Sequence, residues 1–448
     1  MNGTKTNGTS STQPPQANGN VPAGPVLLNI LVVGGGLGGL ATAVALRRKG
    51  HNVTVLEQAP VLGEVGAGIQ IPPNSGRLLE SWGVSAFFED KVVRPKDMTF
   101  RRWEDGSAIA YTKLRPDFSD NYGVPYYVVH RADFHKALHS RATQLGVNVT
   151  INSRVVSYDE AVPMARTEDG REFTADLIIA ADGVKSTARR VVLGGEDIAP
   201  VTTGFAAYRA VVDTSLMRND EDISWLLTTE GLNNWIGEDR HVMTYCIAGG
   251  SLFNMVLSHI DRSDPSTWDP STAVQDMRRY FEGWDYRLNK VISLVTKTVK
   301  WPLISASTIP TWIAPSKKLV LLGDSAHAMV PYMSQGAAMA VEDGAALAEV
   351  LSSITSKRDM SKASQAYEKE RMKRSYGMQT ASLVNGKLWH FADGPEQRAR
   401  DAGMSAEVEG RPFVESTNQW SDPTTQLWVY GYDAEEEMTK SWATVIGH

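Results

Sequence analysis

Residues 29–39 of this chain read NILVVGGGLGG, a short apolar run followed directly by a glycine-rich turn. The β-branched residues of the run favour a buried parallel strand. The turn has the spacing G-x-G-x-x-G at Gly34, Gly36 and Gly39. Glycines at these positions permit a tight turn, close approach of the backbone to a pyrophosphate, and packing of a helix on the strand. The stretch therefore predicts the first part of a dinucleotide-binding unit.

The residues that follow complete the same unit. Residues 40–48 have the alanine and leucine content of a helix that ends at Gly50, and residues 52–56 read as a second strand. Glu57 ends that strand, 23 residues after Gly34, close to the spacing of about 20 for an acid that accepts a ribose hydroxyl. A packing turn would explain the glycines alone, but the ordered strand, turn, helix, strand and acid favour a dinucleotide site.

Two later strands stop at an aspartate beside a glycine. One apolar run ends at Asp182-Gly183, and another ends at Gly323-Asp324. Either pair alone can be an ordinary turn, but an aspartate at a strand end can also bond a ribose or ribityl hydroxyl. The second pair leads through small residues into a helix near Gly336-Ala337, whose first N–H groups can face a flavin carbonyl.

Composition limits the class of protein. The 448 residues are 42% hydrophobic and 21% charged, with a net charge of −6, so collagen-like and wholly disordered chains are excluded. The mild acidity gives no reason to expect nucleic acid or anionic lipid as a partner. The single cysteine, Cys246, excludes an intramolecular disulfide and a Cys-rich zinc site. We predict a cytoplasmic protein without a bound metal.

Two segments need separate interpretation. Residues 1–25 hold almost no apolar side chains, and we predict a disordered tail. Residues 27–46 carry no charge and are long enough to cross a bilayer. Their glycines and the strand that follows favour a buried strand, turn and helix instead, so we expect no membrane span.

The three motifs together resemble the single-component aromatic hydroxylases that use FAD and NAD(P)H, and most closely the salicylate hydroxylase-like enzymes, including fungal ones that act on phenolic polyketides. The resemblance runs from Leu27 to a C-terminal element at 422–442. Residues 64–70 resemble the family's flavin-flanking loop, and 130–134 resemble the segment whose arginine contacts FAD. Ser334 and Ala338 stand where the family often has glycine, and glycine or asparagine. The resemblance implies non-covalent FAD held by Gly34, Gly36, Gly39, Glu57, Gln70, Arg131, Asp324, Gly336 and Ala337.

The resemblance also implies a reaction. Reduced flavin would form a C4a-hydroperoxide with O2 and hydroxylate a phenolic or other electron-rich aromatic molecule, in fungal secondary metabolism or salicylate-type catabolism. NADH or NADPH would bind only transiently, because no second dinucleotide motif is present. Arg209 would hold the phenolate and Tyr245 would orient it, although a structural ion pair and a core aromatic are the plain alternatives. We expect His241 at the surface or a strand end, and a structural role for His327.

The predicted fold is α/β: a Rossmann-like FAD-binding domain (26–200 and 305–360) is interleaved with an antiparallel β-sheet substrate domain (201–304), and a helical region (361–448) follows. Other functions stay open. An FAD-dependent epoxidase or oxidase of an alkene or indole would carry the same motifs. An NAD-dependent dehydrogenase would leave Asp182-Gly183 and Gly323-Asp324 unexplained, and a binding module would show no turnover. The substrate and the oligomeric state are not determined by the sequence.

Overall fold

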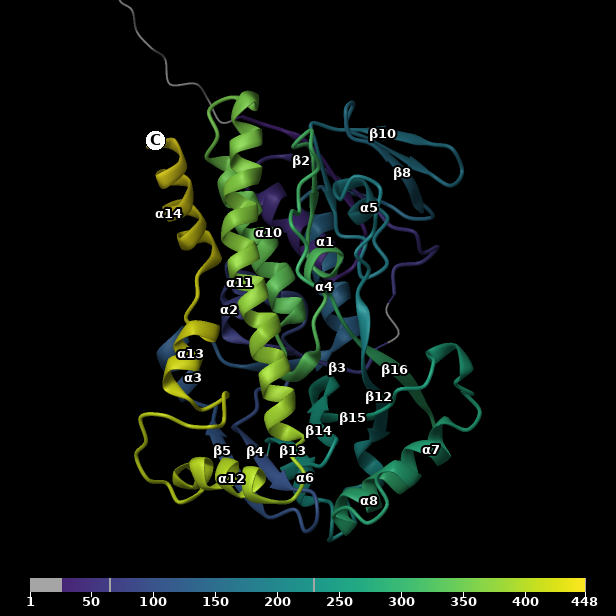
Figure 1. Ribbon diagram of the computed structural model, residues 1–448, viewed down its shortest axis with the longest axis vertical. Coiled ribbons are helices and arrows are strands. Elements are labelled where there is room, and N and C mark those ends of the chain that lie inside the picture. The colour runs from purple at the N-terminus through teal and green to yellow at the C-terminus, as the bar shows by residue number, and fades with distance from the viewer. Residues whose placement is uncertain (1–25, 64–65, 229, 448) are drawn as a thin grey trace, which may run out of the picture.

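The computed structural model describes residues 26–63, 66–228 and 230–447. The predicted tail at 1–25, and Glu64 and Val65 of the flavin-flanking loop, lie outside the described residues. Figure 1 shows an elongated molecule with a smaller parallel sheet toward one end and a larger sheet toward the other. The long helix α11 (Met360–Trp389) runs along both parts.

A five-stranded parallel sheet carries the glycine-rich turn. Its strands, in spatial order, are β17 (Leu319–Leu321), β11 (Leu177–Ala180), β1 (Asn29–Val33), β2 (Asn52–Leu56) and β7 (Asn148–Thr150). Helix α1 (Leu37–Arg48) crosses α10 (Gly336–Ser352) so closely that a Cβ on Gly344 would come within 2.7 Å of Thr42 Oγ1. β17 pairs with β11 but follows β12 to β16 of the second sheet in the sequence. The FAD-binding part is therefore discontinuous in sequence, as the predicted fold class requires.

The second sheet has seven strands. In spatial order these are β16 (Thr298–Ser305), β12 (Val201–Asp213), β15 (Leu252–Ile260), β14 (Arg240–Ile247), β13 (Leu232–Gly237), β4 (Asp97–Arg102) and β5 (Ala108–Lys113). It is wider than the predicted segment 201–304, because β4 and β5 come from within 26–200. It is also not wholly antiparallel, since β13 pairs with β4 in parallel. That pairing joins residues more than 100 positions apart, which leaves no local signal in the sequence.

The two faces of the larger sheet have different neighbours. Along β12 side chains alternate between faces, and Tyr208 packs with α7 (Ala273–Tyr280) and α8 (Tyr286–Ser293) in one apolar cluster. Ala207 lies in another cluster, which includes Trp389 at the end of α11. The second face therefore looks toward α11 and the FAD-binding part.

Shorter elements complete the fold. A two-stranded pair, β3 (Gly68–Ile71) and β6 (Tyr127–His130), connects the two parts. A three-stranded meander lies apart from them, formed by β8 (Val155–Asp159), β9 (Met164–Thr167) and β10 (Glu172–Thr174). The short helices are α2 (Pro73–Ser81), α3 (Asp117–Tyr122), α4 (Arg131–Gln144), α5 (Ala188–Val192), α6 (Trp225–Thr228) and α9 (Asp324–His327).

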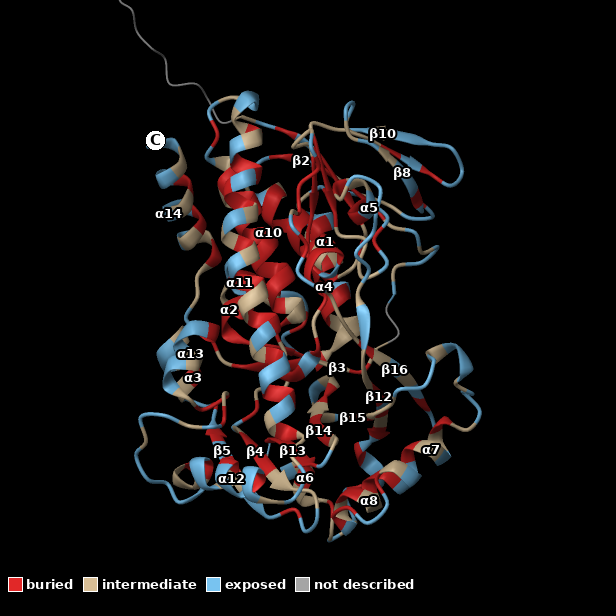
Figure 2. Cartoon of the chain, in the orientation of Figure 1, coloured by how far each residue is buried: buried red, intermediate tan, exposed pale blue. Residues whose placement is uncertain are grey.

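The C-terminal region is helical, as predicted. After α11 come α12 (Pro395–Val408), α13 (Pro423–Tyr430) and α14 (Ala434–Ile446). Figure 2 shows α10 buried along most of its length, whereas α11 alternates between buried and exposed stretches. Within the described part of the chain, no helix is both long and apolar enough to cross a membrane.

Candidate active site

A cavity of about 360 Å³ lies where the two sheets face each other. One wall, called the cofactor wall here, comes from residues predicted to hold FAD; it includes Gly36, Gln70, Arg131, Asp324, Gly336 and Ala337. The opposite wall, called the sheet wall, comes from the larger sheet and the end of α11; it includes Ala207, Arg209, His241, Met243, Tyr245 and Trp389. The structure thus brings Arg209, Tyr245 and six of the nine residues predicted to hold FAD to one cavity, whereas Gly34, Gly39 and Glu57 do not line it.

The glycine-rich turn has the geometry that its spacing predicts. Gly34 has φ of +108°, and a Cβ there would lie 2.2 Å from the Ala181 carbonyl oxygen. A Cβ on Gly39 would lie 1.9 Å from the Gly34 carbonyl oxygen. A Cβ on Gly36, in contrast, would meet no atom within 4 Å. The first and third glycines are required by packing, and the second leaves open space of the kind that a pyrophosphate needs.

Glu57 holds this turn against the end of β2. Its Oε2 accepts a hydrogen bond from the Gly35 N–H at 2.7 Å, and its Oε1 accepts one from the Ala59 N–H at 2.8 Å. A carboxylate offers about four acceptor positions, so the side chain retains capacity for a ribose hydroxyl. Glu57 itself does not line the cavity, and its contact with a ribose stays a prediction.

The two Asp-Gly motifs differ in role. Asp182 Oδ2 accepts from the N–H groups of Thr187 and Ala188 at 3.0 and 3.3 Å, just where α5 begins. These two bonds stabilise the turn before α5, as an aspartate commonly does. The other carboxylate oxygen of Asp182, Oδ1, is buried and has no hydrogen-bond partner among the described residues. Asp324 is exposed and lines the cavity at the start of α9, where a ribityl or ribose hydroxyl can reach it.

The N-terminus of α10 points donors at the cavity. The first hydrogen bond of the helix runs from the Met339 N–H to the Gln335 carbonyl at 2.8 Å, so the N–H groups of Gly336 and Ala337 lie ahead of the intrahelical ladder. Ser334, just before them, has φ of +52° and ψ of 33°. Glycine adopts this left-handed conformation more readily than serine does.

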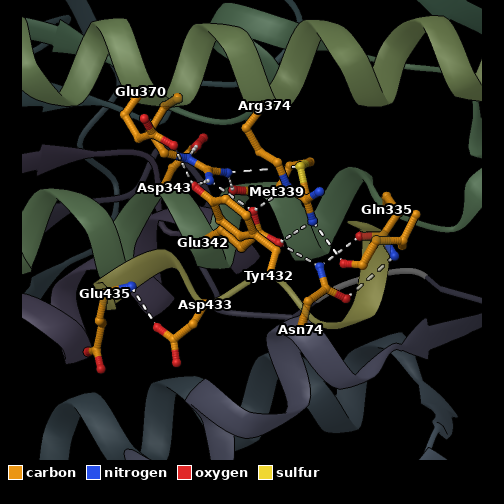
Figure 3. Close-up of polar contacts among 12 residues, drawn as sticks. Asn74, Gln335, Met339, Glu342, Asp343, Glu370, Arg374, Tyr432, Asp433 and Glu435 are labelled. Atoms are coloured by element: carbon orange, nitrogen blue, oxygen red, sulfur yellow. Dashed lines mark hydrogen bonds and ion pairs between the residues drawn. The ribbon is translucent and has the colours of Figure 1, made fainter. Parts of the chain in front are cut away.

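A buried ion network lies behind this helix end (Figure 3). Arg371 of α11 pairs with Glu342 at 2.9 Å and Asp343 at 2.8 Å, all three fully buried. Arg374 pairs with Glu342 at 3.1 Å and donates to the Trp428 and Val429 carbonyls. The two arginines therefore attach α10 to α11 and to the C-terminal segment.

The same network reaches the loop in front of α10. Asn74 of α2 donates from Nδ2 to Gln335 Oε1 at 2.9 Å and to Glu342 Oε1 at 2.6 Å. Figure 3 shows Asn74 between Gln335 and Glu342. The backbone that presents Gly336 to the cavity is thus held by paired charges and an amide bridge.

His327 belongs to this network, as the structural interpretation predicts. Its Nε2 lies 2.6 Å from Asp343 Oδ2, both side chains are fully buried, and His327 does not line the cavity. Burial raises the pKa of Asp343, but the neighbouring His327 and Arg371 outweigh it and hold that pKa below its ordinary value. The carboxylate stays charged and paired.

On the sheet wall, Arg209 lies on β12, the second strand from one edge of the sheet, opposite Val256 of β15. It is exposed at the cavity. Tyr245 of β14 is buried, and burial raises its pKa, while Arg209 and a hydrogen bond with Gln70 act in the opposite direction. The Arg209 guanidinium thus lies close enough to Tyr245 to act on its pKa, and the predicted roles of the two residues toward a substrate stay predictions.

Tyr245 is where the two walls touch. A Cβ on Gly68 would lie 2.4 Å from Tyr245 Cε2, and the Gly68 N–H donates to Asn254 Oδ1 at 2.7 Å. Gln70, two residues further along β3, accepts from the Tyr126 hydroxyl at 2.7 Å. Strand β3, which begins within the predicted flavin-flanking loop, is thus fixed against the sheet by Tyr245, Asn254 and Gln70.

The expectation for His241 holds for its place near a strand end and is wrong for its exposure. It is the second residue of β14, but it is only 3% exposed and lines the cavity. Its Nδ1 lies 2.8 Å from Nε2 of His390, which follows the last residue of α11. Burial and the neighbouring His390 lower the pKa of His241 well below its ordinary value. His390 and Trp389 were missed because nothing in the local sequence shows that α11 ends at the sheet.

Other reactive groups lie elsewhere. Burial raises the pKa of Cys246 to about 11, so its thiol is not activated as a nucleophile. Among the described residues, no group of three or more His, Cys, Asp and Glu side chains could hold a metal ion.

Comparison with known proteins agrees with this geometry. Residues 28–382 match the family described as "FAD binding domain". The chain is 36% identical over 412 residues to the FAD-dependent monooxygenase OpS4 of Beauveria bassiana, covering 91% of this chain and 95% of that protein. It is 34% identical to 3-hydroxybenzoate 6-hydroxylase of Polaromonas naphthalenivorans, covering 84% and 92%. The fold matches a substrate complex of salicylate hydroxylase with a TM-score of 0.75 and 25% identity, covering 93% and 98%.

The chain belongs to the family of FAD-dependent monooxygenases and hydroxylases that these relatives define. A further solved relative, CtdE in complex with FAD and a substrate, has a TM-score of 0.78 and 25% identity, covering 94% of this chain and 99% of that one. The open space at Gly36 and the exposed N–H groups at Gly336 fit the FAD that the family binds. The protein is therefore a flavin-dependent oxidoreductase of the salicylate hydroxylase type.

Proposed function

We propose that this enzyme hydroxylates a phenolic or other electron-rich aromatic small molecule, using NADH or NADPH and O2. One observation carries the proposal: Arg209 and Tyr245 line the same cavity as the cofactor motifs, on the opposite wall. The relatives 3-hydroxybenzoate 6-hydroxylase and salicylate hydroxylase are named for phenolic acids, which supports the same substrate class here.

FAD would be held without a covalent bond. Six of the predicted residues line the cavity: Gly36, Gln70, Arg131, Asp324, Gly336 and Ala337. Gly34 and Gly39 shape the turn, and Glu57 holds it through Gly35. When bound and reduced by the nicotinamide cofactor, FAD supplies the reactive oxygen; the protein positions and activates the ring and excludes water.

Arg209 would bind and stabilise the phenolate. A phenol becomes a stronger nucleophile when it loses its proton, and a guanidinium fixed beside the phenol oxygen favours the anion. Tyr245 keeps its proton because burial raises its pKa. Its hydroxyl can therefore donate to the substrate oxygen and orient the ring beside Arg209.

The rest of the sheet wall suits a flat apolar ring. Met243, Val256, Leu303 and Trp389 line the cavity, and its volume of about 360 Å³ is in the range of small-molecule sites. Apolar walls exclude water from the reacting oxygen, which would otherwise be lost as hydrogen peroxide.

The test uses FAD-loaded protein with NADH and with NADPH. Each phenol of a panel is compared with its own methyl ether, which keeps the ring but has no proton to lose. We expect at least one phenol to stimulate NAD(P)H oxidation and to gain one oxygen atom by mass spectrometry, while its ether does neither. Equal oxygen insertion into phenol and ether, or only into alkenes or indoles, would overturn the proposal.

A further inference from the structure

One row of side chains crosses the larger sheet from β12 to β13 (Figure 1). Arg209 of β12 pairs with Val256 of β15, and Val256 pairs in turn with Met243 of β14. Met243 pairs with Asn234 of β13. Residues directly opposite one another on neighbouring strands point to the same face of a sheet. Because the first three of these residues line the cavity, the side chain of Asn234 lies on the cavity face as well.

The side chain amide of Asn234 is buried without a bond. The residue is fully buried, and neither its Nδ2 nor its Oδ1 has a hydrogen-bond partner among the described residues. A carboxamide offers two donors and an acceptor with two lone pairs, and an unpaired polar group in a protein interior costs stability, whereas an apolar group of the same shape does not. A polar group that arrives with a ligand would account for an amide at this position.

The preceding residue, Asn233, shows the contrast on the same strand. It is also buried, but successive side chains of a strand point to opposite faces, and its Oδ1 accepts a hydrogen bond from Arg101 Nε at 2.7 Å. Asn233 therefore has a structural partner on the far face of the sheet. Burial on β13 does not by itself leave an asparagine unpaired.

Asn234 lies just beyond the inner end of the cavity. Met243 beside it lines the cavity, and so does Trp389. The ring of Trp389 packs on Phe100 with centroids 5.6 Å apart, and Phe100 of β4 pairs with Asn234 on its other side. A methionine side chain is unbranched and has three rotatable bonds. Met243 can therefore turn aside and connect the cavity with the amide.

The surroundings of Asn234 favour a neutral partner. Its neighbours on the same face of β13, Leu232 and Ile236, belong to an apolar cluster that also holds Phe100 and Met243. A carboxylate would be costly to bury there without a cation, whereas a carbonyl or a hydroxyl needs only the amide. Arg209 and Asn234 are three strands apart, or about 14 Å between Cα atoms. A molecule that reaches both lies across the apolar side chains between them.

We propose that Asn234 is a substrate-binding residue that recognises a carbonyl or hydroxyl group on the side of the ring away from the phenol oxygen. The proposal rests on the phenol hydroxylation proposed above and narrows its substrate class to phenols with a second, neutral polar group. Arg209 holds one end of such a molecule and Asn234 holds the other. Two polar contacts at opposite ends of an apolar floor fix the direction of the ring, which one contact does not.

The test compares phenols of matched shape. 4-Hydroxyacetophenone is paired with 4-isopropylphenol, and 6-acetyl-2-naphthol with 6-isopropyl-2-naphthol, so that only the carbonyl differs within a pair. Dissociation constants for oxidised, FAD-loaded enzyme are measured from the change in flavin absorbance, and stability is measured in a thermal melt. The variants are Asn234→Leu and, as the matched control, Asn233→Leu on the opposite face of the same strand.

The ratio of the two dissociation constants within a pair isolates the amide, because the ligands' own hydrophobicity is the same for every variant. For at least one pair, Asn234→Leu should shift this ratio by about 10-fold in favour of the isopropyl phenol, since a buried carbonyl loses its only partner. Asn234→Leu should melt at the wild-type temperature or above it. Asn233→Leu should melt lower and keep the wild-type ratio.

Three results would overturn the inference. An unchanged ratio in Asn234→Leu for both pairs would show that the amide meets no substrate group, and an equal shift in Asn233→Leu would show that the ratio follows disturbed packing of β13. Wild type that hydroxylates other phenols but binds neither acetyl phenol also rejects it. In these cases the proposed function stands if any phenol gains an oxygen atom. If no phenol does, that function fails first and the role of Asn234 fails with it.

Discussion

The two walls of the cavity present different parts of the chain to it. The cofactor wall uses backbone groups at glycine turns, such as the N–H of Gly336, held by a network of paired charges behind α10. The sheet wall presents side chains from several elements, such as Arg209 on β12, Tyr245 on β14 and Trp389 on α11. Backbone recognition needs only a fixed turn, whereas side-chain recognition can change one residue at a time. This difference explains how one FAD-binding frame can serve several aromatic substrates.

The largest expected effect is on the ion network of the cofactor wall. Arg371→Met leaves Glu342 and Asp343 buried without their shared partner, which costs about 3–5 kcal/mol of unfolding free energy. Urea denaturation of the FAD-loaded protein measures it. The control, Arg411→Met, breaks a pair whose side chains are 57% and 54% exposed and should cost about 1 kcal/mol or less. Equal losses in the two variants would show that the network is not what stabilises this wall.

The contact between the walls gives the next largest effect. Gly68→Ala places a methyl group 2.4 Å from Tyr245 Cε2, so the ring must move. FAD binding should survive, while the hydroxylation rate should fall by about 10²-fold, as for an ångström-scale misplacement of a catalytic group. Gly63→Ala is the matched control, because a Cβ there meets nothing within 4 Å. Loss of FAD from Gly68→Ala would assign Gly68 to the cofactor wall alone.

Glu57 tests the cofactor wall by itself. Glu57→Ala removes the acceptor of the Gly35 N–H bond and of the predicted ribose bond. FAD should bind more weakly by about 1.5–3 kcal/mol, the range for a charge-assisted hydrogen bond, as measured by titrating the apoprotein with FAD. Hydroxylation per bound flavin should stay near the wild-type value. The exposed Glu409→Ala provides the control, and an unchanged affinity in Glu57→Ala would reject the ribose contact.

The smallest effect is expected at Ser334. The left-handed backbone at this position costs a residue other than glycine about 1–2 kcal/mol of stability. Glycine avoids that cost but loses about 0.5–1 kcal/mol, because it gives up more conformational freedom on folding. Ser334→Gly should therefore raise stability by about 1 kcal/mol or less and leave FAD content unchanged, as seen in a thermal melt. A clear loss of stability would mean that the Ser334 side chain has a role of its own.

The cofactor wall could be predicted closely from the sequence. Its first motif is local, because a glycine turn, the helix after it and the acid at the next strand end act over about 20 residues, whereas Gln70 and Arg131 came from resemblance to a family. The roles of Gly34, Gly36 and Gly39 were readable from spacing alone, and the packing at each position agrees. The structural role of His327 was also predicted, although its partner Asp343 was not.

The sheet wall could be predicted only in part. Arg209 and Tyr245 came from resemblance to a family, and their opposing positions depend on the register of β12, β14 and β15, which no local pattern specifies. The inclusion of β4 and β5 in the sheet, and the approach of His390 to His241 across 149 positions, are long-range contacts. These contacts bury His241. The sequence places it near a strand end, but only the fold shows that it lines the cavity.

The most direct test of the central claim compares Arg209→Gln with wild type. Product and hydrogen peroxide are measured together while NAD(P)H is consumed, with Tyr245→Phe as a milder change in the same wall. The account predicts that Arg209→Gln keeps FAD and still oxidises NAD(P)H, loses about 10²–10³-fold of its hydroxylation rate, and releases the consumed oxygen as hydrogen peroxide. The account would be contradicted if Arg209→Gln hydroxylated at the full rate and released no more hydrogen peroxide than wild type. The sheet wall would then not activate the substrate.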